Sequence, residues 1–323
     1  MMAASPGLEE AAMIRGEPAY FSREHYEAHA GVAPPYLSEL VVHCLELVAL
    51  LAERRLPFRF KGGNSLLILL EDPQRFSIDV DIVTLEPRDS LTQVVSQVAE
   101  ASTVFTGWES RAPKTKPWLP LTSFKIYFDS AYRPAEQSFV MLDAVHAPAP
   151  YPGVRKPVRC GTLYQTNIEV ELPHPSGLIG DKLLAIGPRT LGIPFGKGKE
   201  AQRLKHVFDV ATLCRCGYDR SVVRRAADGC QRQEEQIQGR THAWAAISED
   251  TRDFCESALA QPTMPDPSTI DEGDLCLAEI VRGFAQFREH LFRLEYTWEL
   301  FQEDCRQVVA LLEELDREPP PGE

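Results

Sequence analysis

A glycine pair followed closely by two aspartates constrains this chain more than any other feature. The segment reads KGGNSLLILLEDPQRFSIDVDI at positions 61–82. Residues 58–60 (FRF) favour a short strand, and Gly62 and Gly63 favour a turn whose backbone N–H groups can approach an anion closely. Residues 64–70 form an apolar run of helical length. The order of strand, glycine turn and helix therefore predicts a phosphate-binding turn.

The second part of the segment, SIDVDIV, alternates polar and apolar residues as a half-buried strand does. Alternation places Asp79 and Asp81 on one face, while Val80 and Ile82 face a core. Paired carboxylates supply the hard oxygen ligands that Mg²⁺ or Mn²⁺ prefers, and substrate phosphates can complete the coordination. Each pattern alone also suits an ordinary turn or an exposed strand. Together they predict metal-dependent nucleotidyl transfer from an NTP.

The overall composition is that of a globular protein. The chain has 323 residues, 44% of them hydrophobic and 25% charged, which suits two domains and excludes a disordered chain. The net charge of −13 argues against a broad basic surface for nucleic acid. Eight cysteines without a repeating spacing indicate free thiols rather than a disulfide framework, and Cys214 and Cys216 lack the usual zinc-site spacing.

No segment is expected to cross a membrane. The best candidate, residues 40–52, is short and is interrupted by His43 and Glu46. The first residues include Glu9 and Glu10, where a signal peptide has basic residues. We therefore expect a cytoplasmic protein.

Three parts are predicted along the chain: a loose leader over 1–35, an α/β core over 36–175 and a helical domain over 176–323. The regions expected in the core are helices over 37–55 and 89–102 and strands over 123–130, 138–147 and 160–173, with the first two of these strands forming a hairpin.

Further charged residues could join the two aspartates. Asp143, in the second arm of the hairpin, could reach the same metals or act as a general base, whereas Asp129 falls at a strand end. Lys182 is expected at the start of a helix, and Asp209 lies off the apolar stripe of a later helix, available to a cleft. A basic stretch hints at RNA; its cations are Lys182, Arg189, Lys197, Lys199, Arg203 and Lys205.

These motifs resemble the AbiEii-type nucleotidyltransferases, the toxin components of abortive-infection and MenT-like toxin–antitoxin systems. The matching motifs are KGG, NSL, RFSIDVD, GDKLLAI and RLKHVFDVATL, which together extend over roughly residues 59–213. The sequence departs from the family at Asn64, where Thr or Ser is usual, and at His206 and Val207, which replace Arg and Asp.

The resemblance implies a polymerase-β-like nucleotidyltransferase fold with a mixed sheet flanked by helices, followed by the helical domain. It implies metal ligation by Asp79, Asp81 and Asp143 and phosphate contacts from Lys182, oriented by Asp209. The nucleotide-binding residues that it implies are Lys61, Gly62, Gly63, Asn64, Ser65, Arg75 and Ser77, the last supporting the turn.

The function expected from this resemblance is transfer of a nucleoside monophosphate from NTP to an RNA 3′ end, with tRNA as the acceptor, in a type IV-like toxin–antitoxin system. A cognate antitoxin, an AbiEi-like regulator, is a possible partner, and no membrane is involved. One alternative is transfer to a small molecule or a protein hydroxyl. Another is a nucleotide-binding module that acts through a regulatory partner.

Overall fold

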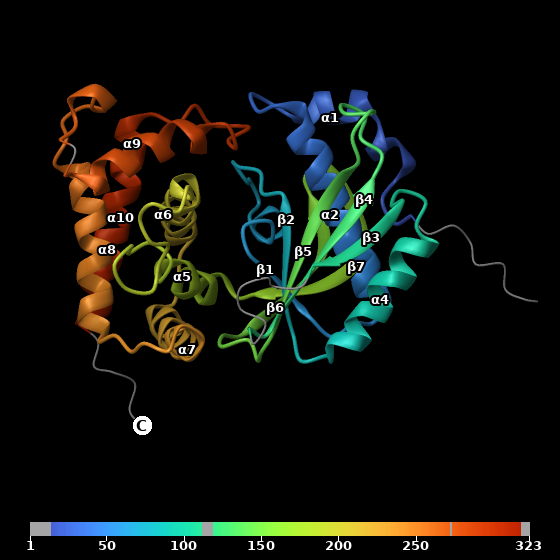
Figure 1. Ribbon diagram of the computed structural model, residues 1–323, viewed down its shortest axis with the longest axis horizontal. Helices are drawn as coiled ribbons and strands as arrows, with labels where there is room; N and C mark the ends of the chain where they lie inside the picture. The colour runs from blue at the N-terminus through green and yellow to red at the C-terminus, as the bar shows by residue number, and fades with distance from the viewer. Residues whose placement is uncertain (1–13, 112–118, 272, 318–323) are drawn as a thin grey trace, which may run out of the picture. The chain divides into compact units, whose positions relative to one another are not determined.

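The structure, a computed structural model, describes residues 14–111, 119–271 and 273–317. The chain divides into two compact units (Figure 1). The first contains the described residues up to Pro148 together with Arg155–Leu172, and the second contains Ala149–Val154 and the chain from Pro173 onward. The first unit is built on a sheet and the second on helices, so the predicted α/β fold followed by a helical region is confirmed.

Seven strands within the described residues form one mixed sheet in the order β3-β4-β5-β2-β1-β7-β6. The central strand β2 pairs antiparallel with β1 and parallel with β5, and the predicted β4–β5 hairpin is confirmed as an antiparallel pair. The strands are β1 (Arg59–Lys61), β2 (Asp79–Thr84), β3 (Gly107–Arg111), β4 (Leu121–Phe128), β5 (Ser138–His146), β6 (Gly153–Cys160) and β7 (Tyr164–Pro173).

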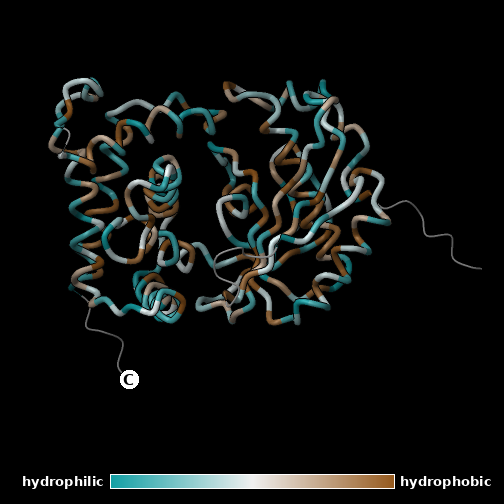
Figure 2. Tube along the Cα trace, viewed as in Figure 1, coloured by the Kyte–Doolittle hydropathy of each residue, from teal (hydrophilic) through white to brown (hydrophobic). Residues whose placement is uncertain are grey.

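Helices α2 (Pro35–Glu53) and α4 (Arg88–Ala101) contact each other and pack against the sheet strands. The strand residues that alternate with the aspartates, among them Val80, Ile82 and Leu142, are fully buried. Figure 2 shows apolar residues running along these elements. The core therefore fixes which strand residues face away from it.

Helix α2 contradicts the expectation that the apolar stretch 40–52 is too short to cross a membrane. The helix extends beyond this stretch and, at 19 residues with a mean hydropathy of 1.5, is long and apolar enough to do so. However, 78% of that window is buried inside the protein. Burial on this scale is typical of a core helix, and it explains why α2 is apolar nearly all round rather than amphipathic.

The described part of the predicted loose leader is folded instead. Residues Pro18–Phe21 form η1 and Arg23–His29 form α1, whose Tyr26 is buried. Glu46 of α2 binds this segment, because its carboxylate accepts hydrogen bonds from the backbone N–H groups of Arg15 and Gly16 at 2.7 and 2.8 Å. Part of the leader thus belongs to the first unit.

The second unit is helical throughout its described core. Aromatic rings of Phe208, Phe284, Phe287, Tyr296 and Phe301 pack together in its interior. The helices are α5 (Pro175–Leu183), α6 (Glu200–Arg215), α7 (Arg220–Gln238), α8 (Trp244–Leu259), η2 (Pro267–Thr269), α9 (Leu275–Arg288) and α10 (Trp298–Asp316).

Candidate active site

The glycine turn lies directly against the second aspartate. Strand β1 ends at Lys61, which is opposite Asp81 in the β1–β2 register. Gly62 follows with a φ of +74°, and a Cβ built on it would lie 2.0 Å from Asp81 Oδ2. Only glycine both adopts this left-handed backbone easily and leaves room for the carboxylate. The sequence pairing of glycine and aspartate is therefore a physical contact.

Gly63 is enclosed by the residues that precede β2. A Cβ at this position would lie 2.7 Å from Arg75 Nη2 and 2.7 Å from Ser77 Oγ. Arg75 is buried, and its Nη1 donates to the carbonyl oxygen of Phe76 at 3.1 Å. The predicted role of Ser77 beside the turn fits this placement, and the Arg75 side chain also lies close to Gly63.

Asn64 and Ser65 complete the turn and are fully buried. The Ser65 hydroxyl donates to the carbonyl oxygen of Gly62 at 2.8 Å, and Asn64 Nδ2 donates to the carbonyl oxygen of Asp79 at 3.4 Å. These two bonds join the turn to itself and to β2. Helix α3 (Leu66–Leu69) is shorter than the predicted run 64–70, so anion binding here would depend on the turn N–H groups rather than on a long helix dipole.

Three carboxylates share one face of the sheet. Asp81 of β2 pairs directly with Asp143 of β5, and Asp79 pairs with Met141. Asp79 is exposed, whereas Asp81 and Asp143 are half-buried. The prediction that Asp79 and Asp81 share one face of β2 is confirmed, because they alternate along the strand with the buried Val80 and Ile82.

The donor chemistry of this face fits a divalent cation. Asp143 Oδ1 is buried and has no hydrogen-bond partner within the described structure. A buried carboxylate oxygen without a donor is costly unless a cation neutralises it, and carboxylate oxygens suit Mg²⁺. Among the residues described, no group of three or more His, Cys, Asp or Glu side chains is arranged to hold a metal ion. The alignment of Asp81 with Asp143 is therefore the part of the predicted ligand set that the fold brings together.

Cys44 of α2 is a neighbour of this site that the sequence did not reveal. Its Sγ donates to the carbonyl oxygen of Ile78 at 3.2 Å. Burial raises the pKa of the Cys44 thiol, and the nearby carboxylates of Asp79 and Asp81 raise it further. The thiol therefore stays protonated and unreactive.

Lys182 and Asp209 form a buried ion pair inside the second unit. Lys182 Nζ lies 2.7 Å from Asp209 Oδ2, and the two side chains are 5% and 1% exposed. Lys182 lies in the last turn of α5 rather than at the start of a helix. Asp209 was expected to be available to a cleft, but burial against Lys182 occupies it instead. The expectation that Asp209 orients Lys182 fits this geometry.

Only some residues of the predicted basic patch lie on the protein surface. Arg203 is fully buried and pairs with Glu279 at 3.0 Å, so it supports the helical unit internally. Lys197 and Lys199 do line a cavity of about 450 Å³ in this unit, together with Asp181 and Glu234. The cavity therefore has acids as well as bases, and the net positive charge of the patch is smaller than the sequence indicates.

Comparisons with known proteins place this geometry in context. The sequence profile of a family described as "Nucleotidyl transferase AbiEii toxin, Type IV TA system" matches residues 45–307. The fold is similar to that of MenT4, a nucleotidyltransferase toxin from Mycobacterium tuberculosis H37Rv, with a TM-score of 0.52 and 16% identity over 91% of this chain and 99% of that chain.

A nucleotidyltransferase-like protein from Paracoccidioides brasiliensis, described as antigenic, is similar with a TM-score of 0.39 and 14% identity over 65% of this chain and 92% of that chain. No curated protein sequence matches the chain.

Proposed function

Since the chain belongs to the AbiEii family of nucleotidyltransferase toxins of type IV toxin–antitoxin systems, we propose that it transfers a nucleoside monophosphate from an NTP to the 3′ hydroxyl of an RNA, with tRNA as the acceptor. The contact of Gly62 with Asp81 carries this proposal. It joins an anion-binding turn to a carboxylate, which is what a metal–triphosphate complex requires.

In this proposal the residues of the first unit have separate roles in catalysis. The turn N–H groups bind the triphosphate, while Asp79, Asp81 and Asp143 would hold divalent cations. Those cations would neutralise phosphate charge and lower the pKa of the attacking hydroxyl. As the 3′ oxygen bonds to the α-phosphorus, the bond to pyrophosphate breaks. Asp143 has two alternative roles here: it holds a cation with the other two aspartates, or it accepts the proton of the attacking hydroxyl. The parts assigned to Lys182 and Asp209 stay predictions.

The net negative charge of the chain favours a second candidate function, with a different acceptor. A net charge of −13 does not favour a long RNA-binding surface. Transfer to a small molecule or to a protein hydroxyl would need no such surface, and it would use the same NTP site. The family also implies an antitoxin as a partner of this chain, and we propose that toxin and antitoxin meet in the cytoplasm.

One labelling experiment separates these candidates. The purified protein is incubated with α-³²P-labelled NTPs, Mg²⁺ and total RNA, and the label is traced to RNA, protein or small molecules. We expect label on RNA that EDTA abolishes and excess Mg²⁺ restores, and we expect none with Asp79→Asn or Asp81→Asn. Leu85→Ala is the control, since Leu85 is 75% exposed just beyond the other end of β2. Label on protein or a metabolite alone would reject the RNA acceptor.

A further inference from the structure

A cavity of about 340 Å³ lies beside Asp79 within the first unit. Its walls come from the start of α2, the loop between β4 and β5, and the first residues of β5. The volume lies within the range of small-molecule sites, roughly 300–1,000 Å³. None of the predicted site residues except Asp79 lines it, so the nucleotide turn does not account for it.

The walls of this cavity suit a flat aromatic group. Tyr36, Phe139 and Met141 provide apolar surface, and Phe139 is 37% exposed although it is a large hydrophobic residue. Arg133 is the cation among the lining residues, and its guanidinium lies 5.4 Å from the centre of the Tyr36 ring. The acids Glu39, Asp79 and Glu136 also line the cavity. Lys125 lies outside the lining and pairs with Glu109 at 3.1 Å, and its Nζ is 4.6 Å from the centre of the Phe139 ring. Aromatic rings with adjacent cations are how proteins stack unpaired bases and hold their phosphates.

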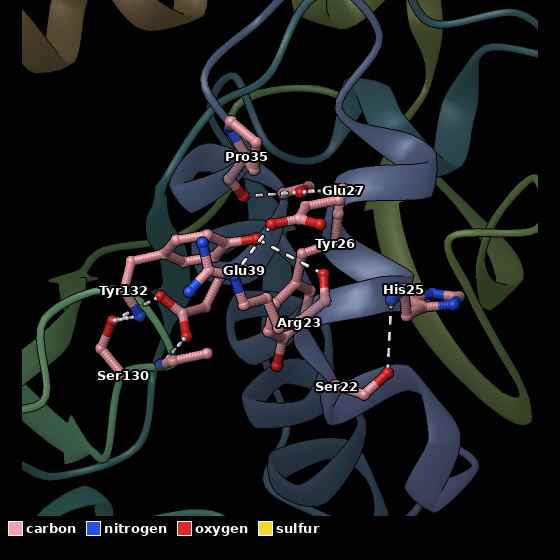
Figure 3. Close-up of polar contacts among 11 residues, drawn as sticks. Ser22, Arg23, His25, Tyr26, Glu27, Pro35, Glu39, Ser130 and Tyr132 are labelled. Carbon is pink, nitrogen blue, oxygen red and sulfur yellow. Dashed lines mark hydrogen bonds and ion pairs between the residues drawn. The ribbon is translucent and has the colours of Figure 1, made fainter.

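The loop that carries Arg133 is fixed by a buried acid. Glu39 of α2 is 2% exposed and accepts hydrogen bonds from the Ser130 hydroxyl at 2.7 Å and from the Ala131 N–H at 2.6 Å. The Ser130 oxygen in turn accepts the N–H of Arg133 at 3.1 Å. Figure 3 shows the Glu39 carboxylate turned toward Ser130. The cavity is thus held in shape before any ligand arrives.

The position of the cavity indicates which substrate it takes. In the order β5-β2-β1, the glycine turn follows β1 on one side of β2, and the cavity lies at the start of β5 on the other. In nucleotidyl transfer the attacking and leaving oxygens are roughly in line on opposite sides of the phosphorus. If the turn holds the leaving pyrophosphate, a hydroxyl held in the cavity would approach from the other side of β2.

We infer that this cavity is the acceptor subsite and binds the terminal nucleoside of the RNA, with its base against Phe139 or Tyr36 and its phosphate near Arg133. The inference rests on the proposed function. It also explains how an acidic protein could accept RNA, because base stacking and one cationic contact from Arg133 at the 3′ end would replace an extended basic surface.

The test compares acceptor and nucleotide kinetics in wild type, Phe139→Ala, Phe139→Tyr and Arg133→Ala. For Phe139→Ala we expect kcat/KM for total tRNA to fall roughly 5- to 150-fold, the effect of losing one base–aromatic stack. KM for NTP should stay within about twofold of wild type, and Phe139→Tyr, which keeps the ring, should retain most activity. Leu85→Ala is the control for loss of an exposed apolar side chain.

In Phe139→Ala, binding of a 5′-fluorescein oligoribonucleotide ending in CCA should weaken in parallel with the fall in kcat/KM. This binding is measured by fluorescence anisotropy without NTP. Wild-type transfer to RNA with unchanged acceptor kinetics in both alanine variants would overturn the subsite and leave the proposed function standing. A rise in KM for NTP equal to that for tRNA would also overturn it, since the cavity would then serve the nucleotide. If the wild type labels no RNA, the proposed function fails and the subsite with it.

Discussion

Replacement of Gly62 by alanine tests whether the turn and the carboxylate form one unit. An alanine Cβ would lie 2.0 Å from Asp81 Oδ2, and the backbone φ of +74° already disfavours an L residue. The second effect alone costs about 1–2 kcal/mol of stability. Gly239→Ala would measure this backbone effect alone, because φ at Gly239 is +68° and, its chain neighbours aside, no described residue has an atom within 4 Å of the Cβ position.

The difference between the two variants measures the displacement of Asp81. Side-chain Cβ atoms essentially never approach another atom closer than 3.0 Å, so Asp81 Oδ2 must retreat by about 1 Å. A shift of about 1 Å in a reacting group can cost about 100-fold in rate. We therefore expect Gly239→Ala to lose about 1–2 kcal/mol of stability with near-normal transfer, and Gly62→Ala to lose about 100-fold in kcat as well.

Urea unfolding and transfer of labelled NMP at saturating NTP would measure the two effects. Both variants must be assayed at a temperature where each is folded, so that the rate reports on the site alone. If Gly62→Ala transfers label within about threefold of Gly239→Ala, less than the rate cost of such a displacement, then Asp81 tolerates the displacement and the contact does not organise the site.

Three other predictions concern ionisable side chains. Lys182→Met should destabilise the protein by about 3–5 kcal/mol in urea unfolding because it leaves Asp209 buried without its cation, and Lys182→Met/Asp209→Leu should recover much of the loss. Burial lowers the pKa of His43 to about 4. The unfolded chain then binds more protons below pH 6.5, so stability should fall by about 3 kcal/mol between pH 7 and 4, and His43→Leu should flatten this fall. Asp143→Asn should abolish transfer yet keep or raise Tm in EDTA, since it relieves two paired carboxylates.

Each of these has an outcome that contradicts it. A double variant no more stable than Lys182→Met would mean that the cost is lost packing rather than an unpaired charge. An unchanged pH dependence in His43→Leu would assign the acid sensitivity to other groups. A lower Tm for Asp143→Asn in EDTA would mean that the carboxylate is satisfied in the metal-free protein.

The sequence predicted the local parts of the site better than their surroundings. Alternation along 77–83 is a property of the strand itself, so the facing of Asp79 and Asp81 could be predicted. The β4–β5 hairpin could be predicted because two β-prone runs lie on either side of a turn-like segment that contains Pro134. Strands β3 and β6 were not predicted, because they are edge strands with exposed, charged residues and little apolar alternation.

Properties that depend on partners distant in the chain could not be predicted. Asp209 looked free because its helical stripe excludes it, yet Lys182 of another helix buries it. Arg203 looked like surface charge, but Glu279 pairs with it in the interior. The role of Glu39 in holding residues 130 and 131 likewise depends on tertiary packing, and no spacing in the sequence signals it.

The parallel pairing of β2 with β5 also has a consequence for biosynthesis. Asp81 meets Asp143 only after α4, β3 and β4 have been made and the hairpin has docked beside β2. Contacts between distant segments form late, because loop closure must precede them. A chain emerging from the ribosome would therefore carry the glycine turn and the first two aspartates long before the third joins them. We expect nucleotidyl transfer by this chain to begin only when its sheet is complete.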